Sequence, residues 1–216
     1  MNLILFGPPG AGKGTQANKL VDEFRLFKIS TGDLLREEIN KKSSLGKKIK
    51  SLINKGIFVP DELINNLVEN ILSNKKYSNH IIFDGYPRNL QQAKNLELLT
   101  KKYNQKINCV LCLKVDRKSI IKRILGRQIC SKCHLIFNEF YSPASKNNHI
   151  CDPKFLQKRA DDDENTVISR YETYAVETMP IFEHYKNQKL LYEIDGMLDI
   201  SSIYKQIRQI ILSLET

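Results

Sequence analysis

The 216-residue sequence has no tryptophan, no low-complexity tail and no apolar run of the roughly 18 residues that a membrane-spanning helix requires. Its first residues lack the basic segment that begins a secretory signal, and a glycine-rich turn follows them at once. The five cysteines are an odd number without an export signal, so we expect a reducing, cytoplasmic setting. With 41% hydrophobic and 27% charged residues, the composition excludes wholesale disorder. These absences predict a globular protein that buries its core without disulfides.

Acidic residues are fewer than basic ones. The chain has 24 Asp and Glu against 34 Lys and Arg, a formal net charge of +10. This excess is compatible with a nucleic-acid partner, a small anionic substrate or a well-solvated surface. No basic stripe with interleaved aromatic residues accompanies it, so neither nucleic acid nor a membrane is expected as a partner.

Short apolar runs alternate with segments of helical periodicity. The runs have the length and composition of strands buried on both faces, at residues 3–6, 27–29, 81–84, 109–115 and 190–195. Helical periodicity is clearest at 13–24, 61–72 and 200–214. The alternation predicts an α/β fold, a doubly wound parallel five-stranded sheet with helices on both faces.

Two segments, 30–59 and 126–162, fit this alternation poorly. The first is rich in lysine and its helical pattern ends at Pro60, and the second contains three cysteines and few periodic apolar residues. We interpret both as insertions on a core domain made of residues 1–29, 60–125 and 163–216.

The turn at residues 7–15, GPPGAGKGT, lies between the first strand and the first helix. Glycines allow a backbone that turns its N–H groups inward around an anion, and the helix N-terminus adds partial positive charge. Lys13 is placed to reach phosphate and Thr15 to lie near a metal ion, although Gly14 stands where the usual pattern has Ser or Thr. The turn is therefore predicted to bind a nucleotide's phosphates.

Five motifs together resemble the adenylate kinase family of nucleoside monophosphate kinases, in its long-lid type. They are GPPGAGKGTQ at 7–16, STGDLLR at 30–36, FDGYPRN at 83–89, GRQICSKC at 126–133 and RADDDENTVISR at 159–170. The resemblance covers essentially the whole chain, in order and with family-like spacing. It implies an ATP:AMP phosphotransferase that converts Mg-ATP and AMP reversibly into two ADP and serves adenine nucleotide homeostasis and salvage. It also implies a monomer, with 30–59 as an AMP-binding flap and 126–162 as a lid.

The resemblance also implies roles for individual residues. The catalytic set is Lys13, Arg88, Arg123, Arg127, Arg159 and Arg170. The ATP site comprises Gly10, Ala11, Gly12, Lys13, Gly14, Thr15, Arg123, Arg127, Ile136, Phe137 and Leu198. The AMP site comprises Thr31, Arg36, Ile57, Phe58, Val59, Gly85, Tyr86, Pro87, Arg88, Gln92, Arg159 and Arg170. Asp84 is the residue implied to hold Mg²⁺ through water.

The arginines are not spread like the lysines. Five of the nine fall in the family-like motifs and a sixth, Arg123, lies just before the 126–133 motif, whereas the 25 lysines are dispersed along the chain. Because a guanidinium binds phosphate oxygens in pairs and stays charged, this distribution favours a small phosphorylated substrate over a polyanion.

Cysteines in the second insertion have metal-ligand spacing. Cys130 and Cys133 form a CxxC turn and Cys151 follows, which suits a structural zinc ion. The family's fourth ligand would be residue 154, a lysine here, so the candidates are His149, Asp152 and, less favoured, His134. A turn that holds no metal is the alternative.

A second CxxC pair, Cys109 and Cys112, lies in an apolar strand, where the spacing places the two thiols on opposite faces of the sheet. We interpret both as core residues rather than as a redox or metal pair.

Three other functions compete with AMP phosphorylation. A kinase for UMP/CMP or GMP is disfavoured by the long 126–162 segment and by Thr31 and Gln92, which match the family's adenine-selecting positions. A nucleic-acid-associated P-loop ATPase lacks a recognisable binding motif. A zinc-binding module on an inactive core would require an incomplete catalytic set, and the set is complete.

Overall fold

The computed structural model describes residues 1–55 and 58–214, so Ile57, expected at the AMP site, lies outside the described residues. The strands are β1 Leu3–Phe6, β2 Phe27–Ser30, β3 Ile81–Asp84, β4 Cys109–Lys114, β5 Arg127–Cys130, β6 Ile136–Asn138, β7 Leu156–Gln157 and β8 Leu191–Asp195. The α-helices are α1 Lys13–Phe24, α2 Thr31–Asn40, α3 Ser44–Asn54, α4 Asp61–Leu72, α5 Leu90–Lys102, α6 Arg117–Leu125, α7 Glu164–Thr173, α8 Pro180–Asn187 and α9 Ile200–Ser213. Short 3₁₀ turns occur at η1 Lys75–Tyr77, η2 Ala144–Lys146 and η3 Pro153–Phe155, and η4 Tyr174–Thr178 is a π-helical turn.

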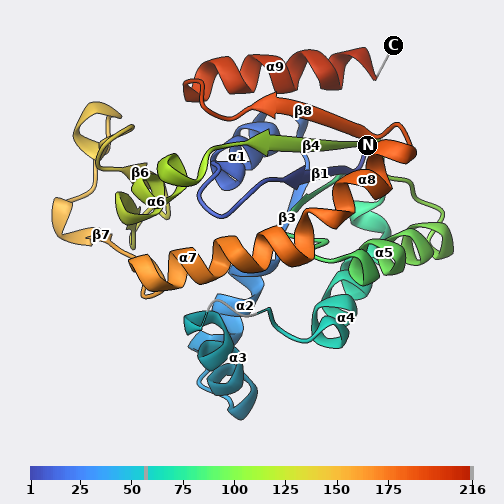
Figure 1. Cartoon of the computed structure of the whole chain (residues 1–216), viewed down its shortest axis with the longest axis horizontal. Helices are drawn as coiled ribbons and strands as arrows, with labels where there is room; N and C mark the ends of the chain where they lie inside the picture. Colours follow the sequence, from blue (N-terminus) through green and yellow to red (C-terminus); the bar gives the residue numbers. More distant parts are fainter. Residues whose placement is uncertain (56–57, 215–216) are drawn as a thin grey trace.

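The central sheet has the predicted five parallel strands, in the order β2-β3-β1-β4-β8 within the part of the chain that the structure describes (Figure 1). Ile4 of β1 pairs with Phe83 of β3 on one side and Val110 of β4 on the other. Because all five strands run the same way, their carboxyl ends meet at one edge of the sheet. The turns after β1 and β3 lie there, and such an edge is where open α/β sheets bind ligands.

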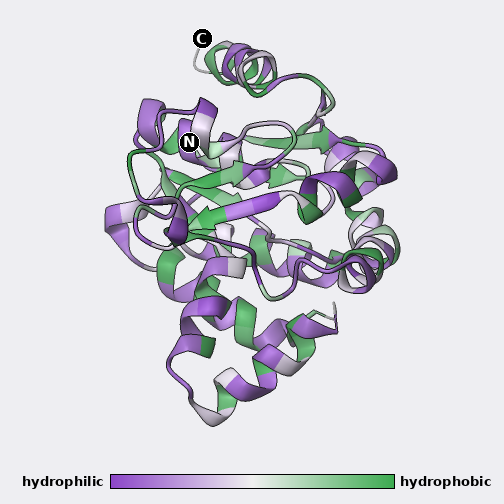
Figure 2. Ribbon diagram, turned by 90° about the vertical axis from the view of Figure 1, so that its left-hand side faces the viewer, coloured by the Kyte–Doolittle hydropathy of each residue, from purple (hydrophilic) through white to green (hydrophobic). Residues whose placement is uncertain are grey.

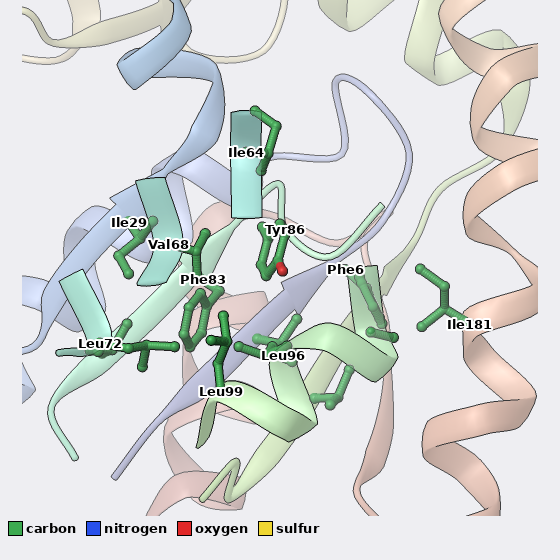
Figure 3. Packing of buried hydrophobic residues seen from close by; sticks show 14 of the residues in the cluster. Phe6, Ile29, Ile64, Val68, Leu72, Phe83, Tyr86, Leu96, Leu99 and Ile181 are labelled. Atoms are coloured by element: carbon green, nitrogen blue, oxygen red, sulfur yellow. The ribbon is translucent and has the colours of Figure 1, made fainter. Parts of the chain in front are cut away.

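Alternate side chains of the sheet fill two hydrophobic cores. Ile4, Phe6 and Phe83 pack with α4, α5 and α8 on one face, as the close-up in Figure 3 shows. Leu3 and Leu5 face the other side, where α1 and α9 cover the sheet. In Figure 2 most of the central strands are coloured hydrophobic, whereas the surrounding helices carry both hydrophilic and hydrophobic residues. The doubly wound prediction is confirmed.

Cys109 and Cys112 belong to opposite cores, as their spacing predicts. Burial raises the pKa of Cys109 to about 12 and that of Cys112 to about 11, which keeps both thiols protonated at neutral pH.

The described part of the 30–59 segment forms two helices, α2 and α3, packed on each other. The Ser30 and Ser43 hydroxyls cap α2 and α3 by accepting from the N–H groups of Asp33 and Gly46. A Cβ at Gly46 would lie 2.6 Å from the Glu38 carbonyl oxygen, so only glycine allows the two helices this close. Pro60 precedes α4 and does not terminate α3, which ends at Asn54.

The 126–162 segment contains a small antiparallel sheet, in the order β6-β5-β7, which sequence periodicity did not predict. Its own core consists of Cys130, Phe137 and Ala144, with Cys151 and Phe155 packed against it. Among the described residues, no helix is both long enough and apolar enough to cross a membrane.

Candidate functional site

The turn between β1 and α1 forms the anion cradle that the sequence predicts. Gly10 and Gly12 have φ of 78° and 94°, values that L side chains rarely adopt, and a Cβ at Gly10 would also lie 2.7 Å from Ile124 Cγ1. Within the described parts of the chain, no side chain caps the first turn of α1, so its N–H groups remain available to an anion.

Lys13 lies inside this cradle. Its Nζ donates to the carbonyl oxygens of Gly7 and Pro8, at 2.7 and 2.9 Å. Burial lowers the pKa of Lys13 to about 8, with a smaller opposing effect from Asp84. The pKa of Lys13 is therefore close to neutral pH. A phosphate bound in the cradle would stabilise the charged ammonium.

Asp84 ends β3 and faces the same cradle. Strand pairing places it beside Leu5, and its Oδ2 lies 3.5 Å from a Cβ built on Gly14. A carboxylate at this distance from a phosphate cradle fits a magnesium ion held through water, since Mg²⁺ prefers oxygen ligands and retains several waters.

A second group of polar contacts surrounds the turn after β3. The Gly85 carbonyl oxygen accepts from Thr31 Oγ1 at 2.8 Å and from Arg88 Nε at 2.7 Å. Gln92 Oε1 accepts from the Arg88 N–H at 2.7 Å, while Gln92 Nε2 donates to Asp61 Oδ1 at 2.6 Å. Gly85 has φ of 81°, and a Cβ there would lie 3.1 Å from both Thr31 Oγ1 and Arg88 Nη2, so glycine is needed at this turn.

Tyr86 and Pro87 follow in the same turn, but the Tyr86 ring points away from it into the core (Figure 3). Its hydroxyl donates to Asn65 Oδ1 at 2.8 Å, and burial raises its pKa to about 12. Of Tyr86, only the main chain can border a ligand in this turn.

A cavity of about 120 Å³ joins the two groups. It is lined by Leu5, Phe6, Gly7, Pro9, Lys13, Gly32, Leu35, Arg36, Ile53, Phe58, Val59, Gly85, Pro87, Arg88, Asp161, Arg170, Tyr174 and Thr178. The structure thus brings together residues far apart in the sequence, from Leu5 to Thr178, and from both of the expected nucleotide sites.

Two buried aspartates form ion pairs with two arginines of the expected catalytic set. Arg127 forms a two-point ion pair with Asp162, with Nε to Oδ2 at 2.8 Å. Arg170 Nη1 donates to Asp161 Oδ2 at 2.8 Å. Asp161 and Asp162 lie in the 159–170 motif, but no role was predicted for them from the sequence. Two adjacent carboxylates just before a helix that carries an arginine could have indicated such a pairing.

Arg88 and Arg159 are less well compensated than these two arginines. Burial, with a smaller contribution from Arg170, lowers the pKa of Arg88 to about 10. Burial and then Arg127 lower that of Arg159 to about 10, and Arg159 Nε has no hydrogen-bond partner within residues 1–55 and 58–214. Arg36 pairs with Asp33 beside Gly32. Like charges held together out of water favour an anion between them.

Arg123 lies on α6, next to Ile124, which packs against Gly10 of the cradle. Its Nη2 donates to the Gly196 carbonyl oxygen at 2.8 Å, and its guanidinium lies 5.6 Å from the Tyr141 ring centroid. Tyr141 was not among the predicted site residues, although an aromatic next to Phe140 in a polar segment was a usable signal. Leu198 lies in the exposed turn after β8.

Ile136 and Phe137 point in different directions. Ile136 Cδ1 lies 3.9 Å from a Cβ built on Gly14, so it overlies the phosphate cradle. The Phe137 ring is buried inside the small sheet's core, 4.7 Å from the His149 ring, because neighbouring strand residues face opposite sides. Only the main chain of Phe137 is left to meet a nucleotide.

The predicted cysteine ligands are gathered into one cluster. Donor atoms of Cys130, Cys133, His149 and Cys151 all lie within 4.8 Å of one another. His149 Nε2 is buried and has no hydrogen-bond partner among the described residues. Asp152 instead caps η3, accepting from the Lys154 N–H at 2.9 Å. Three thiols and one imidazole with an unmatched nitrogen fit a tetrahedral zinc site.

Comparison with known proteins agrees with this geometry. The sequence model of a family described as "Adenylate kinase" matches residues 5–190. A protein named "Adenylate kinase" from Pelagibacter ubique (strain HTCC1062) is 47% identical over 211 residues, which cover 98% of this chain and 99% of the relative. Proteins of the same name from Archaeoglobus fulgidus and Fervidobacterium nodosum are 40% and 42% identical, over 98% and 95% of this chain and 98% and 94% of their own lengths.

Proposed function

The chain belongs to the adenylate kinase family, and from that membership we propose that it transfers the terminal phosphoryl group of Mg-ATP to AMP, reversibly, to give two ADP. The observation that carries the proposal is the single cavity that Lys13, Arg88 and Arg170 share. Cations contributed by the cradle, by the turn after β3 and by α7 thus meet at one point. A group in flight between two phosphates needs positive charge on all sides, and little else from the protein.

At the donor end, the cradle and Lys13 bind the β- and γ-phosphates of ATP. Lys13 exchanges its bonds to the Gly7 and Pro8 carbonyls for phosphate oxygens. Arg123 holds the Gly196 carbonyl and so fixes the turn that carries Leu198, the wall expected for the adenine ring. Asp84 would hold Mg²⁺ through water, and that ion supplies charge neutralisation on the phosphates when it is bound.

At the acceptor end, Arg88 and Arg36 bind the phosphate of AMP. Arg88 is already oriented by its bond to the Gly85 carbonyl, and Gln92 is oriented by Asp61. This pre-organisation places the attacking oxygen without the cost of ordering long side chains. AMP phosphate is anionic already, so no general base is required.

Arg127 and Arg170 add to the positive charge around the transferred phosphoryl group by exchanging their aspartate partners for phosphate oxygens. In the structure both are neutralised by Asp162 and Asp161. Phosphate oxygens accept the same paired hydrogen bonds as a carboxylate, so either arginine can turn from its aspartate to the transferring group. Arg159, with one nitrogen unmatched among the described residues, needs no exchange.

We further propose that residues 30–59 and 126–162 act as movable flaps over a monomeric core. The cavity of about 120 Å³ is well below the ~300 Å³ at the lower end of ligand pockets, so nucleotide entry requires opening. The hydroxyls of Thr166 and Ser169 on α7 donate to the Asn54 and Lys55 carbonyls at the end of α3. These two bonds would have to break for α3 to move away from α7.

The lid cluster is proposed to hold one structural zinc ion through Cys130, Cys133, His149 and Cys151. Its place in the small sheet's own core, away from the phosphate cradle, fits a role in holding the lid together and not in the reaction. The wider role, adenine nucleotide homeostasis and salvage in the cytoplasm, follows from the proposed reaction.

A coupled assay with a panel of acceptors tests the reaction. We expect AMP to be phosphorylated by Mg-ATP with a kcat/KM far above that for UMP, CMP or GMP, and expect Lys13→Met to abolish turnover. Faster turnover with UMP, CMP or GMP would replace the acceptor in the proposal. Full turnover by Lys13→Met would overturn the assignment of the cradle itself.

A further inference from the structure

The helical run from α7 to α8, which borders the cavity, is interrupted by a π-helical turn. Helix α7 carries Arg170, α8 packs against the sheet, and η4 at Tyr174–Thr178 joins them (Figure 1). The wider turn closes with the Met179 N–H donating to the Tyr174 carbonyl oxygen at 3.1 Å. Such turns insert an extra residue into a helix and are frequent at functional sites, because they re-aim the side chains beside them.

One side chain re-aimed in this way is that of Thr178. It is 5% exposed, lines the cavity, and its Oγ1 donates to the Arg88 carbonyl oxygen at 2.7 Å. Threonines inside helices usually donate to a carbonyl of their own preceding turn, as Thr100 does to Glu97 in α5. Thr178 instead bonds to a residue 90 positions away in the sequence.

This bond completes a three-point hold on Arg88. The Arg88 N–H donates to Gln92 Oε1, its Nε donates to the Gly85 carbonyl, and its carbonyl accepts from Thr178. The first two holds come from the same turn and the adjoining helix. Among the hydrogen bonds that Arg88 makes with the described residues, only the one from Thr178 ties this turn to the α7–α8 run.

We propose that the Thr178 hydroxyl is a positioning residue for Arg88 and thereby for the acceptor nucleotide. The inference rests on the proposed function, since it assumes that Arg88 binds the acceptor's phosphate. Without the hydroxyl, the carbonyl loses a buried partner and the Arg88 peptide is free to rotate. The guanidinium then points less often at the phosphate, while the cradle and Lys13 are untouched.

Thr178→Val tests the proposal, because valine keeps the shape of threonine and removes the hydroxyl. We expect KM for the acceptor to rise about five- to tenfold, the effect of one lost buried hydrogen bond, with KM for ATP unchanged. Thr178→Ser, which keeps the hydroxyl, should restore the acceptor KM. Thr100→Val is the matched control, since Thr100 is also 5% exposed and its hydroxyl bonds within its own helix.

Parallel increases in both KM values, or a Thr178→Ser variant as impaired as Thr178→Val, would overturn the positioning role. So would an acceptor KM in Thr178→Val no different from that in Thr100→Val. The wild-type protein is first assayed with AMP and with the other monophosphates, and the variants are compared on the best acceptor found. A failure of the proposed acceptor is thus seen in the wild type, and a failure of the Thr178 inference only in the variants.

Discussion

The nucleotide cleft and the lid cluster collect their functional groups in opposite ways. The cleft residues are scattered along the sequence, from Lys13 to Thr178, and the parallel sheet assembles them at the carboxyl ends of β1 and β3. The lid cluster comes from residues 130–151 alone and is held by a sheet of very short strands. The nucleotide cleft therefore depends on the topology of the whole sheet, and the lid cluster depends on the conformation of one short segment.

The two sites also differ in the charge of the ligand that each would bind. The cleft concentrates guanidinium groups and one ammonium whose pKa values are lowered by burial, so it is completed by anions. The lid cluster consists of thiols and an imidazole, so it is completed by a cation. Mutations in the cleft should therefore affect turnover more than stability, and mutations in the lid cluster the reverse.

The largest expected effect belongs to the cleft. Arg88→Met should lower kcat/KM for AMP by about 10³-fold, the lower range for an arginine that stabilises a transferring phosphoryl group. The melting temperature should change by less than about 3 °C, because the charge removed is buried among other positive charges. Steady-state kinetics and thermal unfolding of the nucleotide-free protein measure the two effects.

Arg117→Met is the matched control. The Arg88 guanidinium lies 5.2 Å from the Phe58 ring centroid, and that of Arg117 lies 5.7 Å from the Tyr171 ring centroid. Arg117, however, starts α6 outside the cavity lining. Its kinetics should stay at the wild-type level. If Arg88→Met lost stability and kept its turnover, the contrast between the two sites would be wrong.

The lid cluster should give the opposite pattern. His149→Ala removes the nitrogen that has no other described partner, so the purified protein should lose most of its bound zinc. The melting temperature should fall by roughly 4–8 °C, which corresponds to about 2 kcal/mol in a chain of this length. Turnover at low temperature, where the lid still folds, should fall less than tenfold. Metal analysis and thermal unfolding measure these effects.

Asp152→Asn distinguishes His149 from Asp152 as the fourth ligand. The Asp152 carboxylate caps η3 and an amide oxygen can do the same, so zinc content should remain at the wild-type level. Zinc lost from Asp152→Asn and retained by His149→Ala would reverse the ligand assignment. Absence of zinc from the wild-type protein, expressed with zinc supplied, would remove the metal site altogether.

The same contrast explains what could be predicted from the sequence. The five strands and the cleft motifs were predictable because apolar runs specify buried parallel strands, whose order then brings the motifs together. The sequence named His149 as a candidate fourth ligand but could not choose it over Asp152, since the usual fourth position is Lys154 and the β5–β7 strands are too short to show periodicity. Side-chain direction also escaped prediction: the rings of Tyr86 and Phe137 turn into hydrophobic cores.

The smallest expected effect is a pH dependence that the cleft should show and the lid should not. Burial holds the pKa of Lys13 at about 8 in the nucleotide-free protein, and bound phosphate would raise it. Binding of ATP therefore takes up a proton above that pH, and the affinity falls as pH rises. With a pKa of about 8, the protonated fraction falls from roughly 0.9 at pH 7 to 0.1 at pH 9, so the affinity for ATP should weaken about tenfold.

Calorimetric titration of ATP across pH 7–9 measures this effect, and buffers of different ionisation enthalpy report the proton uptake. AMP provides the internal control, because Arg88 keeps its proton up to a pKa of about 10 and the affinity for AMP should stay level. Zinc content should stay constant too, since thiolate and imidazole ligands need no proton in this range. An ATP affinity that is flat from pH 7 to 9 would mean that Lys13 is fully charged in the free protein, and that burial in the cradle does not set its proton affinity.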